Sequence, residues 1–130
     1  MKEVEFTEMR TEVINAIGAL ADRGYQQRVW VGHEYPSQDY YDDLTLNINI
    51  LYNDTRVLPD PGDAVGSILF PTEVKELRFL AEALTPLIDE LGDSDDVTYL
   101  SDPRWDEVVS RAGDALQFMK LAQSDQTDSE

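Results

Sequence analysis

Apolar residues recur every three or four positions in three parts of the chain, and this spacing is typical of amphipathic helices. The first predicted helix covers residues 7–23, with Thr7 as its N-cap and Gly24 as the residue that ends it. Gly18, inside this helix, costs about 1 kcal/mol relative to alanine and leaves room for a second helix to approach. The apolar stripe consists of Phe6, Met9, Val13, Ile17 and Leu20.

Two further helices are predicted in the second half of the chain. One covers residues 72–91 and ends at Gly92, and Pro86 within it is expected to bend the helix by removing a backbone hydrogen bond. The other begins at Asp102 and Pro103, because aspartate is a favoured N-cap and proline a favoured first helical residue. Its predicted buried face consists of Trp105, Val108, Val109, Ala112, Leu116 and Met119.

Two segments between these helices are less regular. Residues 25–37 contain a β-prone run at positions 29–31, followed by the breakers Gly32 and Pro36. This pattern indicates a short strand or an extended connector, with Trp30 packed inward.

Residues 39–52 fit two patterns. The apolar residues at even positions from 44 to 50 alternate with polar ones, which slightly favours a strand. Other apolar residues of the same segment lie on one helical stripe, and Asn47 and Asn49 are unfavourable in both states. The members of the helical stripe are Tyr41, Leu44, Ile48 and Leu51.

These patterns predict a compact, mostly α-helical domain of three to four main helices. The globular part is expected to cover residues 1–122, and the polar residues 123–130 are expected to form a disordered acidic tail. The alternative is an α+β fold with a short sheet formed by residues 27–31 and 44–52.

The charge of the chain narrows the classes of function. It has 27 acidic residues against 10 basic ones, a formal net charge of −17, which argues against binding to nucleic acids or to anionic membrane surfaces. The absence of cysteine excludes disulfides and thiolate metal sites. Short apolar stretches and an N-terminus unlike a signal peptide predict a soluble, cytoplasmic protein.

Several motifs give the chain a resemblance to small acidic proteins of uncharacterised function, mainly actinobacterial. They are the runs at residues 51–55 and 58–61 with Gly66, then Tyr99-Leu100 and residues 103–105. The resemblance covers most of residues 25–122 and implies a helix over residues 39–52, which is our prediction for that segment. It also permits an immunity-type function, in which a small acidic protein neutralises a toxin, without implying any site residue.

No arrangement of residues points to catalysis. His33 is the only histidine, no Gly-x-Ser-x-Gly motif is present, and the loop of residues 62–66 lacks the lysine of a phosphate-binding loop. We therefore expect His33 to be a surface or hydrogen-bonded residue and the protein to be non-enzymatic, without cofactor or metal. The alternative is a small enzyme or metal-binding protein that uses clustered carboxylates. The clusters are Asp93, Asp95 and Asp96, and Asp54, Asp60 and Asp63.

Acidic residues and tyrosines are concentrated between Gly32 and Asp63, where Arg56 is the only basic residue apart from His33. Tyrosine supplies contact area and carboxylates steer the encounter with a positively charged molecule, so this composition suits an interface for a basic protein. The predicted partner-binding residues are Tyr35, Asp39, Tyr40, Asp42, Asp43, Asp54, Asp60 and Asp63.

The acidity has a second interpretation: a solvated shell that serves solubility or salt tolerance, with the tyrosines partly buried. Charges spread evenly over the surface would favour the solvated shell, whereas a concentrated acidic face beside exposed aromatic residues would favour partner binding. The long apolar stripes of the helices are compatible with a monomer or a homodimer.

Overall fold

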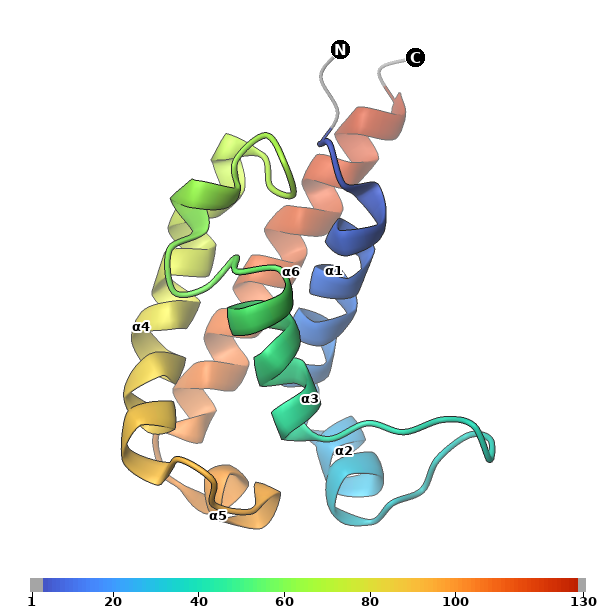
Figure 1. Ribbon diagram of the computed structural model, residues 1–130, viewed down its shortest axis with the longest axis vertical. Helices are drawn as coiled ribbons and strands as arrows, with labels where there is room; N and C mark the ends of the chain where they lie inside the picture. Colours follow the sequence, from blue (N-terminus) through green and yellow to red (C-terminus); the bar gives the residue numbers. More distant parts are fainter. Residues whose placement is uncertain (1–3, 129–130) are drawn as a thin grey trace.

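The computed structural model describes the backbone of residues 4–128 and the side chains of residues 4–122, and this part of the chain forms six α-helices and no strand (Figure 1). The helices are α1 (Thr7–Leu20), α2 (Arg23–Tyr25), α3 (Leu44–Asn49), α4 (Val74–Leu91), α5 (Asp96–Ser101) and α6 (Trp105–Asp128). Two π-helical segments, η1 (Gln26–Val31) and η2 (Ile50–Asp54), continue α2 and α3. Two 3₁₀ turns, η3 (Pro61–Ala64) and η4 (Pro71–Glu73), precede α4.

The three long helices predicted from the apolar spacing are confirmed. α6 packs against both α1 and α4, while α3 and η2 cover one face of α1 (Figure 1). Each helix buries most of its predicted stripe, and Trp105 at the start of α6 is fully buried. Phe6, predicted as part of the first stripe, precedes α1 and is 45% exposed. α4 continues through Pro86. None of the helices in the described part is long and apolar enough to cross a membrane.

Residues 25–37 are not extended as predicted, because residues 26–31 form the wide turns of η1. Trp30 does pack inward and is 2% exposed. Gln26 explains the helical path: it is fully buried, donates to the carbonyls of Ala19 and Leu20, and accepts from the indole N–H of Trp105. These contacts at the end of α1 outweigh the local β preference.

The helix implied for residues 39–52 is confirmed, as α3 and η2, and the alternative sheet of residues 27–31 and 44–52 is wrong. Asp43 caps α3 by accepting a hydrogen bond from the Leu46 amide. Asn47 is 3% exposed, and its amide donates to the Asp42 side chain and the Asp43 carbonyl. Asn47, which is unfavourable in both a helix and a strand, is therefore stabilised inside the protein by these two hydrogen-bond acceptors.

Several helix ends differ from the prediction. Thr7 is the first residue of α1 rather than its N-cap, which is Phe6 and makes no capping hydrogen bond with its side chain. α1 ends at Leu20, and Gly24 lies within α2 rather than ending a helix. The short helix α5 was not predicted. α6 begins at Trp105 rather than at Asp102 and Pro103 as predicted, and in the turn before it the Asp102 carboxylate accepts a hydrogen bond from the Arg104 amide. The backbone of α6 is helical up to Asp128, although the side chains of the predicted tail, residues 123–130, lie outside the described part.

Gly18 gives a first testable expectation. A Cβ atom added there would lie 4.0 Å from Leu116 Cδ2 of α6, which is an ordinary van der Waals contact. Gly18→Ala is therefore expected to raise the free energy of unfolding by about 0.5–1 kcal/mol, because alanine loses less backbone entropy in a helix. Urea denaturation of the two proteins measures this, and a loss of stability would mean that α1 and α6 pack more closely than the structure indicates.

Candidate binding site: an acidic cleft lined with aromatic rings

A cleft of about 370 Å³ lies between two segments of the chain. Both segments are at the end of the bundle opposite to the start of α1 and the end of α6 (Figure 1). One wall is the loop of residues 32–43 with the start of α3, and the other is the loop of residues 92–95 with the start of α5. We call it the acidic cleft. Its lining residues are Trp30, Val31, His33, Tyr35, Tyr41, Asp43, Thr45, Asp93, Ser94, Asp95, Asp96 and Val97.

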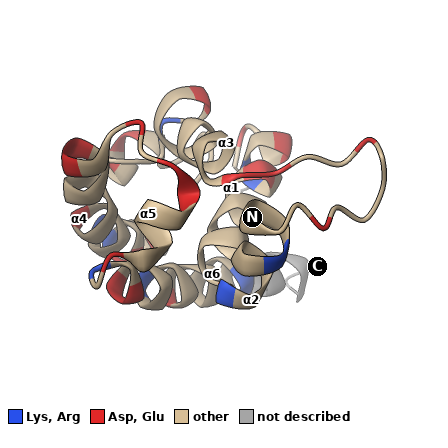
Figure 2. Ribbon diagram, turned by 90° about the horizontal axis from the view of Figure 1, so that it is seen from below, with Lys and Arg blue, Asp and Glu red and all other residues tan. Residues whose placement is uncertain are grey.

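Four carboxylates line the acidic cleft, and no lysine or arginine does. Figure 2, which views this end of the molecule, shows acidic positions on both walls. Asp43 and Asp95 are the N-caps of α3 and α5, and Asp96 links the walls by accepting a hydrogen bond from the Leu44 amide. The ion pairs found among the described residues all involve other acids.

The electrostatics of the acidic cleft reflect this excess of negative charge. Burial raises the pKa of the Asp96 carboxyl, and the neighbouring charges of Asp43 and Asp95 raise it further. Tyr41 donates to the Asp43 carboxylate, and this hydrogen bond raises the pKa of the Tyr41 hydroxyl to about 12. Hydrogen bonds from Thr98 lower the pKa of Asp95, so that carboxylate stays charged. A cation bound in the cleft would relieve the repulsion among these groups.

Aromatic rings form the opposite side of the same cleft. His33 stacks on Tyr35 with ring centroids 5.9 Å apart, and Tyr35 also contacts Tyr41 at 5.8 Å. Tyr41 is 61% exposed, and Val97 on the facing wall is 50% exposed. Ring faces and carboxylates therefore meet at one surface, and His33 is exposed, as the sequence predicts.

Asp42 holds the loop of residues 32–43 in place. It is 8% exposed and accepts hydrogen bonds from the Trp30 indole at 2.8 Å, the Asn47 amide at 2.8 Å and the Tyr25 hydroxyl at 2.7 Å. The Tyr25 hydroxyl is also hydrogen-bonded to that of Tyr40. These bonds tie the C-terminal end of the loop to α2, η1 and α3, so the rings of the cleft are carried by an anchored segment.

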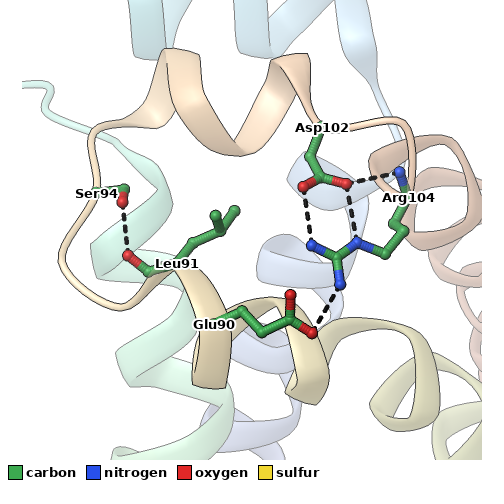
Figure 3. Close-up of polar contacts among 5 residues, drawn as sticks. All are labelled: Glu90, Leu91, Ser94, Asp102 and Arg104. Carbon is green, nitrogen blue, oxygen red and sulfur yellow. Dashed lines mark hydrogen bonds and ion pairs between the residues drawn. The ribbon is translucent and has the colours of Figure 1, made fainter.

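The loop of residues 92–95 is anchored by a different set of bonds (Figure 3). The guanidinium of Arg104 contacts Glu90 and Asp102, each at 2.9 Å, and so ties the end of α4 to the turn before α6. The Ser94 hydroxyl donates to the Leu91 carbonyl at 2.6 Å. Both walls of the acidic cleft are therefore fixed to the helical bundle.

The predicted partner-binding residues have different positions in the structure. Tyr35 and Asp43 line the acidic cleft, whereas the Asp42 carboxylate is used inside the protein. The others are exposed but do not line the cleft: Asp39, Tyr40, Asp54, Asp60 and Asp63.

The facing wall, with Asp93, Asp95 and Asp96, was missing from the predicted interface and considered only as a metal cluster. A signal for it is present in the sequence. The chain has no lysine or arginine between Arg28 and Arg56, and none between Arg78 and Arg104. These two stretches supply the two walls.

Within the described residues, no group of three or more His, Cys, Asp or Glu side chains is arranged to hold a metal ion.

Comparison with known proteins identifies one family. The model described as "Domain of unknown function (DUF7945)" matches residues 4–129. No similar protein was found among curated proteins, and none among solved structures.

Proposed function

The chain belongs to the DUF7945 family, a domain of unknown function, and we propose that it is a non-enzymatic module that binds a basic protein through the acidic cleft. The observation that carries this proposal is the meeting of four carboxylates and several aromatic rings in one cleft that no lysine or arginine lines.

Charge supports the choice of a basic partner. A protein with a net charge of −17 attracts positively charged molecules over long distances, and an acidic cleft concentrates that attraction at one place. The raised pKa of Asp96 reflects burial and repulsion that a bound cation would offset.

Exposed apolar area supports an interface rather than a uniform solvated shell. Tyr40, Tyr41, Leu46 and Val97 are all at least 36% exposed, and Tyr41 and Val97 line the acidic cleft itself. A shell that serves only solubility needs no exposed apolar side chains beside its carboxylates. Aromatic residues within a charged rim are typical of protein interfaces.

An immunity-type role is the specific form of this proposal. In that case the partner is a toxin, and the acidic cleft covers a basic surface that the toxin needs for its action. The resemblance of the chain to small acidic proteins motivates this choice, and identification of the captured partner tests it.

Two variants with equal net charge test the proposal. The first replaces the carboxylates of one wall (Asp93→Asn, Asp95→Asn, Asp96→Asn), and asparagine keeps the capping role of position 95. The second replaces three exposed acids of α1 and α6 (Glu8→Gln, Glu12→Gln, Asp114→Asn). We expect a host protein captured by the unchanged chain to be retained by the second variant and lost by the first. With that protein purified, its association rate should fall as salt rises.

Two results would contradict the proposal. One is equal capture by both variants, because binding would then depend on net charge alone. The other is an association rate that does not change with salt concentration.

A further inference from the structure

We infer that the acidic cleft receives an arginine side chain of the partner and prefers it to lysine. This inference rests on the proposed function and specifies the chemical group that the acidic cleft recognises. It follows from the shape, the rings and the open carboxylate oxygens of the cleft.

The rings provide faces on which a planar cation stacks. Tyr35 lies at the centre of the ring cluster, in contact with His33, Tyr40 and Tyr41 at centroid distances of 5.8–6.1 Å. A guanidinium stacks on such faces by both cation–π attraction and planar contact, whereas an ammonium is a compact charge that holds its water more strongly.

The carboxylates provide acceptors for several donors at once. Asp95 uses Oδ1 for its bonds to Thr98, and Asp96 uses Oδ2 for its bond to Leu44. The second oxygen of each accepts no hydrogen bond from the described residues, and neither oxygen of Asp93 does. The guanidinium carries five N–H donors in a fixed plane, which suits acceptors spread along one wall better than the three donors of an ammonium.

The size and lining of the cleft suit a long side chain with an apolar stem. Its volume is about 370 Å³, and Val31 and Val97 lie among its lining residues. The methylene groups of arginine can contact these apolar atoms while its charged end reaches the carboxylates, as is usual for long basic side chains.

Three blocked tripeptides test the inference: Gly-Arg-Gly, Gly-Lys-Gly and Gly-citrulline-Gly, in which citrulline is a neutral analogue of arginine. Each is titrated into the labelled protein and followed by NMR. The indole N–H signal of Trp30, at the cleft, is the reporter. The indole of Trp105 is the internal control, because it is also buried and hydrogen-bonded but does not line the acidic cleft.

The arginine peptide is expected to shift the Trp30 signal and the amides of residues 93–97 to saturation, without a saturable shift at Trp105. It should bind about two- to fivefold more tightly than the lysine peptide, because a guanidinium stacks on the rings through its plane and is more weakly hydrated than an ammonium. The citrulline peptide should not bind. Tyr41→Leu is expected to remove most of the preference for arginine, because the side chain stays apolar but loses its ring.

Equal binding of arginine and lysine, binding of citrulline, or no saturable binding of arginine would each overturn the inference. The proposed function is decided separately, by the capture experiment with the two charge-matched variants. A partner lost only from the cleft variant, together with equal arginine and lysine binding, would leave the proposed function intact and refute the arginine preference alone.

Discussion

Replacing Glu73 with glutamine is expected to lower the free energy of unfolding by about 3–5 kcal/mol, because it removes one partner of a buried ion pair. Glu73 is fully buried and Arg10 is 3% exposed. The carboxylate accepts two hydrogen bonds from the guanidinium, at 2.8 and 2.5 Å, and a third from the Phe70 amide. In the variant the charge of Arg10 stays buried without its carboxylate.

The pair connects four parts of the fold, which explains the size of the expected effect. Arg10 lies on α1 and Glu73 at the end of η4, directly before α4, and the guanidinium also donates to the carbonyls of Ile68 and Met119. It lies over the ring of Phe70, 4.6 Å from the centroid. Loss of the carboxylate therefore weakens the contact of α1 with α4, with the loop before α4 and with α6.

Urea denaturation measures the change. Glu107→Gln is the control, because Glu107 forms an exposed pair with Arg111 and its loss should cost no more than about 0.5 kcal/mol. The double variant Arg10→Met, Glu73→Leu should be more stable than Glu73→Gln, since it removes both charges of the pair together. A loss below about 1 kcal/mol for Glu73→Gln would show that the pair contributes little.

Asp42→Ala is expected to lower the free energy of unfolding by about 2–4 kcal/mol, since the buried donors of Trp30 and Asn47 lose their acceptor. The Tyr25 hydroxyl loses its bond to the same carboxylate. Because these bonds anchor the loop of residues 32–43, the rings of the acidic cleft should lose their fixed position. Binding of the arginine peptide should then weaken, although Asp42 does not line the cleft.

Asp39→Ala is the matched control for Asp42→Ala. Asp39 lies in the same loop and is exposed, so its replacement should change the free energy of unfolding by no more than about 0.5 kcal/mol. Urea denaturation measures the free energy of unfolding of both variants. The NMR signal of the Trp30 indole, which loses its acceptor only in Asp42→Ala, shows whether the bond to the loop is gone. Equal stability of the two variants would mean that the bonds to Asp42 do not hold the loop.

The acidic cleft was predicted only in part, and the reason lies in its two walls. Tyr35 and Asp43 belong to the acidic, tyrosine-rich segment that composition indicates as an interface. Asp93, Asp95 and Asp96 lie far from that segment in sequence. Spacing along the chain carries no information about which loops meet at one end of a bundle. The sequence therefore did not indicate that these three aspartates face the tyrosine-rich loop.

The sequence by itself determined the three long helices, their buried faces and the excess of negative charge, because helical period and composition are local properties. Only the tertiary structure decided which polar residues go inside. Gln26, Asp42, Asn47 and Glu73 are buried because distant segments supply their hydrogen-bond partners, and a polar group is stable inside a protein only with such partners. The same packing brought two acidic loops together around the rings and so formed the acidic cleft.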